Sequence, residues 1–278
     1  MAYKTILTVV STEGQTAQLD AAITMARRED AHLEVFCLGV DHTQSGYYYA
    51  GASAYVFQES IDKAMTAAET LEKSVRARLE GEAIRWSVDS AVAQVGGLTT
   101  LIGMRARFAD LVVLTRPYGE GASADAEAVT EAALFEGSAP VLIVPDSGLP
   151  DDFGHKVLIA WNQSEEAMTA VRRALPLLKR ADSVEITVVD PSPHGPERSD
   201  PGGALGQMLT RHGIKVEIAV LARTLPAISD IIAQRATETG ADMIVMGAYG
   251  HSRFREAILG GATRNMLGKA AIPVLMAR

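Results

Sequence analysis

The chain has 278 residues, of which 47% are hydrophobic and 22% charged, a globular composition that leaves room for one large domain or two ordinary ones. Its net charge of -8 disfavours sequence-independent binding to nucleic acid, which requires the opposite sign. Cys37 is the only cysteine, which excludes an intramolecular disulfide, and no apolar run approaches the ~20 residues of a membrane span. We therefore expect a soluble, cytoplasmic protein with no membrane partner.

The same succession of apolar runs occurs twice along the chain. In each half, short apolar runs alternate with stretches of helical periodicity, such as 17–27, 58–79 and 167–178. The paired runs, in chain order, are 4–11 and 156–163, 33–41 and 184–190, 84–88 and 216–220, 109–114 and 241–246, and 139–144 and 272–277. Paired runs in one order indicate a duplicated domain.

The alternation of short apolar strands with helices predicts an α/β fold, in which each half is a doubly wound, five-stranded parallel sheet. Residues 145–154 are rich in Pro, Gly and Asp, as linkers are, which predicts domains at 1–146 and 154–278. In such sheets ligands bind beyond the carboxyl ends of the strands. The residues that follow each strand are therefore the candidates for a site.

Glycines are concentrated after the fourth strand of the second half. Gly247 ends the strand, Gly250 follows three residues later, and Gly260 and Gly261 precede a helix predicted from Ala262. Bare backbone N–H groups at a helix start, with the positive end of the helix dipole, form a phosphate cradle. Alternatively, the first two glycines are turn residues and the last two form a helix cap. The glycines alone do not separate these interpretations.

The complete pattern, Gly-x2-Gly-x9-Gly, resembles the nucleotide motif of the universal stress protein family. The resemblance extends to the start of each half, the Ala-Asp-apolar fourth strand and the Pro-Val-Leu fifth strand, and thus to nearly the whole chain. It implies a tandem pair of Rossmann-like domains, of the adenine nucleotide alpha hydrolase-like type. It also implies a stress-response protein that binds ATP, alone or with Mg²⁺.

The resemblance places the nucleotide site mainly in the second half. The residues that correspond to the family's site are Asn162, Val189, Gly247, Gly250, Gly260, Gly261, Ala262 and Thr263. The family usually has Asp against the adenine edge where this chain has Asn162, and Ser or Thr where it has Gly261. The amide keeps an acceptor oxygen and adds donors, and Thr263 offers a replacement hydroxyl. Val189 matches a residue whose backbone touches adenine.

The equivalent segment of the first half lacks the motif. Thr115 stands where Gly247 stands, Tyr118 where Gly250 stands, and Pro117 removes a backbone donor. The segment also carries the acidic residues Glu120, Asp125 and Glu127, which repel a triphosphate. We expect no nucleotide in this half.

Other residues allow two interpretations each. Arg253, Arg255 and His251 either close over phosphates or are solvated loop charges, and Trp161 either stacks on a base or belongs to the core. The aromatic segment 47–57 is an interface or lid, or packs against its own domain. In the family, fifth strands pair, which in this chain predicts 141–144 against 274–277. Homodimers of whole chains are also common in the family.

Nothing in the sequence identifies an enzyme. The six His are scattered and there is no cysteine cluster, so we expect no metal site, and no nucleophile elbow or Walker loop occurs. The leading hypothesis is a nucleotide-binding stress-response regulator. The first alternative is a nucleotide-independent interaction protein with a decayed site. The second, an enzyme on a related adenine-nucleotide hydrolase-like fold, is disfavoured because residues 161–165, which follow the first strand of the second half, are not a Ser-Gly-Gly-rich loop that could cradle a pyrophosphate.

Overall fold

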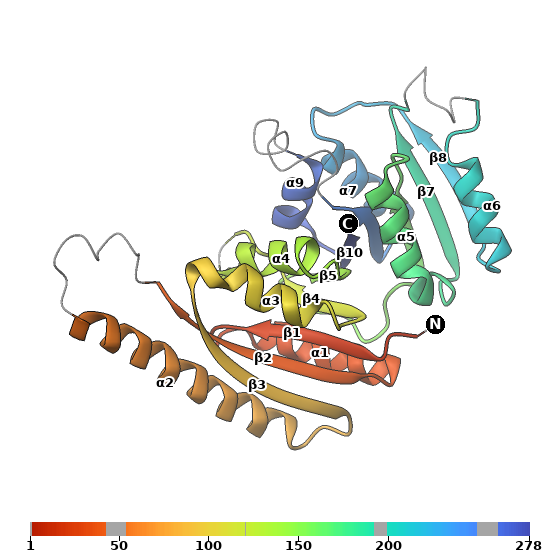
Figure 1. Ribbon diagram of the computed structural model, residues 1–278. Coiled ribbons are helices and arrows are strands. Elements are labelled where there is room, and N and C mark those ends of the chain that lie inside the picture. Colours follow the sequence, from red (N-terminus) through yellow and green to blue (C-terminus); the bar gives the residue numbers. More distant parts are fainter. Residues whose placement is uncertain (1, 43–53, 120, 192–198, 249–260) are drawn as a thin grey trace. The chain divides into compact units, whose positions relative to one another are not determined.

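The computed structural model describes residues 2–42, 54–119, 121–191, 199–248 and 261–278 (Figure 1). The chain divides into two compact units, Tyr3–Ala139 and Pro140–Arg278, the second of which includes Ala2. The domain limits expected from the linker composition, 1–146 and 154–278, remain predictions.

The unit 3–139 is a parallel sheet covered by helices. Its described strands are β1 (Thr5–Val10), β2 (His32–Asp41), β3 (Arg85–Gln94) and β4 (Leu111–Thr115), in the order β3-β2-β1-β4. Its helices are α1 (Thr16–Glu29), α2 (Ala54–Leu79), α3 (Leu98–Ala106) and α4 (Ala126–Phe135), with a short 3-10 turn, η2 (Val95–Gly97). The predicted α/β class with parallel strands is confirmed.

The unit 140–278 repeats this pattern with two additional strands, β5 and β10. Its described strands are β5 (Val141–Val144), β6 (Lys156–Ala160), β7 (Ser183–Val189), β8 (Val216–Leu221), β9 (Met243–Gly247) and β10 (Val274–Ala277), in the order β5-β10-β9-β6-β7-β8. Its helices are α5 (Glu165–Leu178), α6 (Gly203–Arg211), α7 (Ile228–Thr239) and α9 (Ala262–Lys269). Strand β5 runs antiparallel to β10, with Leu142 opposite Leu275, so the predicted pairing of the two fifth strands is confirmed.

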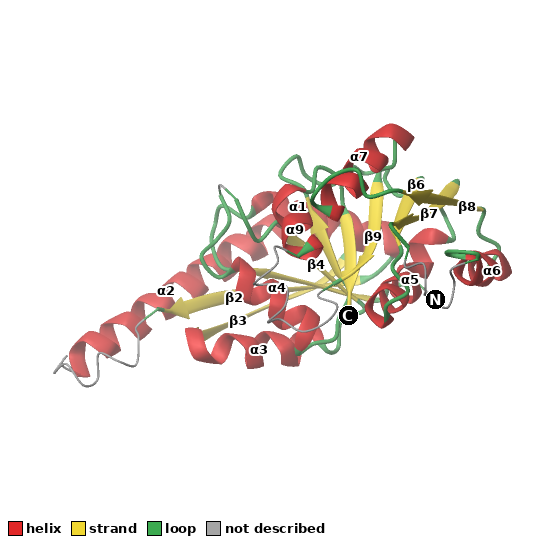
Figure 2. Ribbon diagram, turned by 90° about the horizontal axis from the view of Figure 1, so that it is seen from above, coloured by secondary structure: helices red, strands yellow, loops and turns green. Residues whose placement is uncertain are grey.

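Helices lie on both faces of the strands in each unit (Figure 2). In the unit 140–278, α5 packs on β9 and β10, and α6 on β8, whereas α7 contacts β7 and α9. The central strands are therefore buried on both faces, and residues 111–114 of β4 and 243–246 of β9 are all buried. Near-continuous apolar runs are what such strands require.

One polar residue is repeated for a structural reason. The carboxylate of Asp110, before β4, accepts hydrogen bonds from the backbone N–H groups of Lys4 and Thr5, at 2.8 and 3.0 Å. The carboxylate of Asp242, before β9, accepts from those of His155 and Lys156, both at 3.0 Å. Each aspartate thus ties the start of the fourth strand of its half to the start of the first. The repeated Ala-Asp pair seen in the sequence is part of the fold.

Candidate functional site

A cavity of about 130 Å³ lies at the carboxyl ends of three strands in the unit 140–278. It is lined by residues of β6 and the turn after it, β7, α7, β9 and the start of α9: Ala160, Trp161, Asn162, Thr187, Val189, Ile228, Ile232, Met246, Gly247 and Ala262. Four predicted site residues, Asn162, Val189, Gly247 and Ala262, are therefore brought together. This is the end of a parallel sheet at which α/β proteins bind ligands.

The walls of the cavity are mainly apolar. Trp161 is 6% exposed and lines the cavity, so it is a core residue that borders the site, and its stacking on a base stays a prediction. Ile228, Ile232 and Met246 add aliphatic surface. The hydroxyl of Thr187 donates to the carboxylate of Glu185 at 2.8 Å. A flat, largely apolar group such as a nucleobase suits these walls.

Asn162 shapes the turn from β6 into α5. Its side-chain oxygen accepts a hydrogen bond from the backbone N–H of Ser164 at 3.2 Å, and Gln163 adopts a left-handed conformation with φ 64°. The hydroxyl of Ser164 then caps α5 by accepting from Ala167 N–H at 3.1 Å. Because the Asn162 oxygen holds the turn, its NH₂ group is the part of the side chain with donors to offer a ligand.

Gly247 is a glycine because α5 lies against it. A Cβ atom at this position would stand 2.6 Å from the backbone nitrogen of Ala167 and 2.8 Å from the carbonyl carbon of Glu166. Both neighbours are backbone atoms in the first turn of α5 and cannot move aside cheaply. Packing of the described residues therefore already accounts for a glycine at this position, which the sequence left as either a motif residue or a turn residue.

The start of α9 supplies the polar side of the site. Gly261 is the residue before the helix, Ala262 is its first residue, and the first turn carries no acidic side chain, so the helix dipole is unopposed there. Thr263, whose hydroxyl was expected to replace the missing Ser or Thr, is only 3% exposed. Gly250, Gly260, His251, Arg253 and Arg255 lie outside the described residues. The phosphate side predicted from Gly-x2-Gly-x9-Gly is thus described only from Gly261 onward.

The corresponding position in the unit 3–139 is closed. The cavity at the ends of β1 and β4 measures about 10 Å³, which is about the space of one water molecule. It is closed by Gln18, which is 1% exposed. The Gln18 NH₂ group donates to Val9 O at 2.6 Å and to the Thr8 hydroxyl at 3.0 Å, and its oxygen accepts from the N–H and hydroxyl of Thr115, both at 3.0 Å.

The sequence predicted only that this half binds no nucleotide, on the grounds of Pro117 and acidic residues, of which Glu120 lies outside the described residues. The role of Gln18 was missed. Burial does raise the pKa of Asp125, with His42 nearby acting in the opposite direction. The sequence did contain a signal for Gln18. This long amide stands in the first turn of α1 at the position that Ala167 occupies in α5, and Thr115 stands where the second half has Gly247.

Membrane-spanning helices and metal-holding clusters can be assessed for the described residues only. None of their helices has the length and apolar character that crossing a membrane takes. Among the same residues, no three His, Cys, Asp or Glu side chains are grouped so that they would hold a metal ion.

Comparison with known proteins extends these observations. Residues 154–278 match the model of the universal stress protein family. A universal stress protein of Synechocystis is 28% identical over 124 residues, which are 44% of this chain and 42% of that protein, so the match spans less than half of the relative's length. The crystal structure of a universal stress protein from Archaeoglobus fulgidus superposes with a TM-score of 0.74 at 18% identity, covering 99% of this chain and 98% of that one.

A putative universal stress protein from Pseudomonas aeruginosa gives a TM-score of 0.61 at 16% identity over 99% of this chain and 93% of that one. These two solved structures establish the fold along the chain, and the family model identifies the second half. The second half of the chain, residues 154–278, is thus similar to the universal stress protein family.

Proposed function

We propose that the unit 140–278 binds an adenine nucleotide, ATP in the first place, and that the bound nucleotide regulates a stress response by biasing the chain's conformation or its choice of partner. The base occupies the cavity of about 130 Å³ at the ends of β6, β7 and β9. The phosphates extend toward the amino terminus of α9. The unit 3–139 contributes no second nucleotide site.

The observation that carries this proposal is the pairing of an apolar cavity with an adjoining helix start. Trp161, Val189 and Ile228 offer the base an apolar enclosure, and Ala262 lines the same cavity as the first residue of α9. Anionic groups are favoured at a helix amino terminus, and the first turn of α9 has no carboxylate to oppose them. The base of a nucleotide therefore meets apolar side chains, and its phosphates meet the amino terminus of a helix.

We propose a binding protein and not an enzyme. Catalysis requires a base or nucleophile positioned beside the reacting group. The cavity lining contains no His, Asp, Glu, Lys or Cys among the described residues. ATP turnover above the buffer background, lost on substitution in the cavity, would replace this proposal with a hydrolase.

A nucleotide-independent interaction protein is the second candidate, and two observations favour it. The cavity is smaller than the ~300–1,000 Å³ of typical ligand pockets, and Gly247 is explained by packing against α5. In this reading the second half retains the family's fold with a site that no longer binds.

The deciding experiment is mass spectrometry of nucleotide released from the purified, heat-denatured chain, beside melting curves with and without millimolar ATP. The variant Ala262→Glu places a carboxylate in the cavity, yet suits the start of a helix and therefore folds. Its matched control is Ala126→Glu at the start of α4 in the other unit.

We expect ATP or ADP from the wild type and from Ala126→Glu, and little from Ala262→Glu. When ATP stands at one hundred times its dissociation constant, binding adds about 2.7 kcal/mol, a shift of several degrees in the melting temperature. If none of the three proteins releases nucleotide or responds to ATP, the second candidate function is correct.

A further inference from the structure

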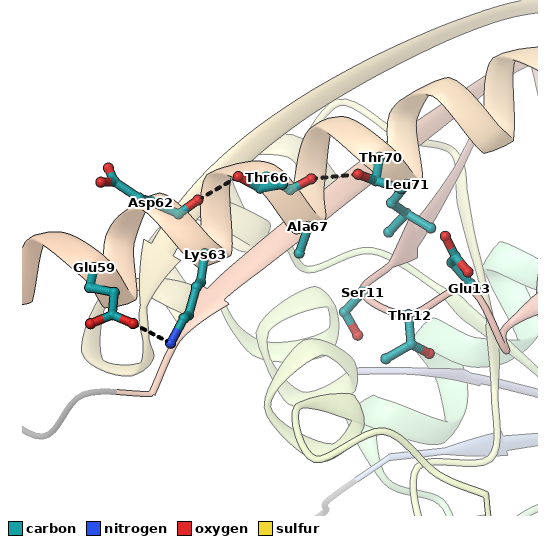
Figure 3. A pocket seen from close by; sticks show the side chains of 10 residues that line it. All are labelled: Ser11, Thr12, Glu13, Glu59, Asp62, Lys63, Thr66, Ala67, Thr70 and Leu71. Atoms are coloured by element: carbon teal, nitrogen blue, oxygen red, sulfur yellow. Dashed lines mark hydrogen bonds and ion pairs between the residues drawn. The ribbon is translucent and has the colours of Figure 1, made fainter.

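A groove beside the closed strand-end cavity lies on the unit 3–139, between α2 and the segment that leads from β1 into α1. Its wider part measures about 540 Å³ and lies between Ser11, Thr12 and Glu13 on one side and α2 on the other (Figure 3). A second part of about 270 Å³ continues between α1 and α2. The two parts share Thr12, Glu13 and Leu71, so they form one α1–α2 groove.

The position of α2 keeps the groove open. A side chain on Gly39 of β2 would overlap the backbone of Ala64, so α2 is seated directly on the sheet. Ser60 donates to the buried Asp41 of β2 at 2.7 Å, and Arg76 donates to Val88 O of β3 at 2.6 Å. These contacts hold α2 against the sheet. The space between α2 and α1 is left unfilled.

The groove has an apolar floor and is closed at the Arg78 end of α2. Val10, Leu19, Leu71 and Val75 contribute the floor. The ion pair between Arg78 of α2 and Asp20 of α1, at 2.9 Å, closes this end. From Glu59 to Arg78 the lining spans nineteen residue steps of α2, or about 28 Å of helix. That length suits a segment of polypeptide better than a compact small molecule.

The charge of the groove is negative. Lys63 is paired with Glu59 at 2.7 Å. Among the described residues, neither Glu13 nor Asp62 has a cation within ion-pair distance, and Asp62 accepts only a neutral amide hydrogen bond from Gln58. The two carboxylates are therefore uncompensated.

Two hydroxyl groups of α2 also favour a positively charged occupant that donates hydrogen bonds. The hydroxyls of Thr66 and Thr70 donate to the carbonyl oxygens of Asp62 and Thr66, at 2.9 and 2.8 Å, as the dashed lines in Figure 3 show. Their protons are used within α2, so they present oxygen lone pairs to the groove. An occupant that donates hydrogen bonds and carries positive charge matches these groups.

We propose that the α1–α2 groove docks a basic, amphipathic segment of a partner protein, whose apolar side chains cover the floor and whose Lys or Arg side chains meet Glu13 and Asp62. An amphipathic helix laid into an apolar groove is a common recognition mode. The docking does not depend on nucleotide binding in the other unit.

The test uses the full chain and a fluorescein-labelled, 14-residue peptide of leucine and lysine arranged with helical periodicity, followed by fluorescence anisotropy. Its counterpart with glutamate at every lysine is the charge control. The charge variant is Glu13→Gln with Asp62→Asn, matched by Asp151→Asn with Glu217→Gln in the other unit. The steric variant is Ala67→Trp in the groove, matched by Ala77→Trp on the same helix outside the lining.

We expect the lysine peptide to bind and the glutamate peptide not to. The charge variant should bind roughly tenfold more weakly at 0.05 M salt, with the difference largely lost at 0.5 M. Ala67→Trp should abolish binding while Ala77→Trp leaves it unchanged. Circular dichroism melting curves identify any variant that fails to fold, and the charge variant then decides the question.

The proposal is overturned if the lysine peptide does not bind at millimolar concentration, if the glutamate peptide binds equally well, or if the groove variants bind like their controls. Self-association of the chain that Ala67→Trp removes, measured by analytical ultracentrifugation, would assign the groove to a second copy and would likewise overturn it.

Discussion

Replacing Gln18 and Thr115 by the residues of the second half tests how the first strand-end site is closed. The variants are Gln18→Ala, Thr115→Gly and the two together, which recreate the Ala167 and Gly247 pair. Gln18 makes hydrogen bonds to Val9 O, the Thr8 hydroxyl and two groups of Thr115. The cavity beside these groups measures about 10 Å³, so water has little room to replace the lost hydrogen bonds.

The hydrogen bonds set the expected magnitudes. At about 0.5–1.5 kcal/mol per bond, plus a cost for buried groups left without a partner, Gln18→Ala should lower the free energy of unfolding by about 3 kcal/mol. Thr115→Gly loses the hydroxyl bond to Gln18, keeps the backbone N–H bond and gains backbone freedom in the unfolded chain, for a loss of about 2 kcal/mol. The double variant counts the one hydroxyl bond that both single variants remove only once, so it should lose about 4 kcal/mol, a coupling of about 1 kcal/mol.

The assay is urea denaturation followed by tryptophan fluorescence. The chain has two tryptophans, Trp86 in β3 and Trp161 in the other unit. A Trp161→Phe background leaves Trp86 as the reporter of the unit 3–139, which avoids treating two units as one transition. If the losses of the two single variants add to that of the double variant within about 0.5 kcal/mol, Gln18 and Thr115 do not act as a unit and the reasoning is refuted.

Three further predictions follow from single residues. Gly247→Ala should lower the free energy of unfolding of the unit 140–278 by about 1–3 kcal/mol, because its Cβ would press on the backbone at Ala167; urea denaturation followed by Trp161 fluorescence measures this loss. Burial raises the pKa of Cys37 from 9.0 to about 12, so at pH 8 its thiolate fraction, and hence its labelling by a disulfide reagent, should be roughly 1,000-fold below that of the unfolded chain. Asp152 and then Asp182 raise the pKa of His155 above 6.5, so this imidazolium stabilises the fold below pH 6.5, and the contribution is lost as pH rises through the folded-state pKa. NMR titration should show that pKa fall in Asp152→Asn, and an unchanged titration curve would contradict the assignment.

The features that the sequence revealed are those encoded by local pattern. The apolar runs and their order sufficed for the strands, because strands buried on both faces must be apolar throughout. The end of β3 was missed, since the pattern suggested 84–88 whereas β3 runs to Gln94. The additional residues, 89–94, pair with Phe36 to Asp41 of β2, a long-range contact that no local pattern records.

The site was predicted unevenly for the same reason. Asn162, Val189 and Gly247 follow strands of a recognisable parallel sheet, so their convergence could be expected. The closure by Gln18 could not, because it depends on a side chain from α1 that meets Thr115 across 97 residues of sequence. The reason for Gly247 was also out of reach, since only the position of α5 reveals that a side chain would strike its backbone.

The two halves differ in where they are hollow, and this difference follows from two local changes. In the unit 140–278, Ala167 and Gly247 leave space at the strand ends, and α6 is 9 residues long. In the unit 3–139, Gln18 and Thr115 fill that space, and α2 is 26 residues long, extending far enough to form a groove with the turn after β1. A nucleotide at the strand ends needs a small pair of residues, whereas a docked peptide needs a long helix. The two proposed activities therefore have separate determinants, and we expect Ala262→Glu to leave peptide docking unchanged and Ala67→Trp to leave nucleotide release unchanged.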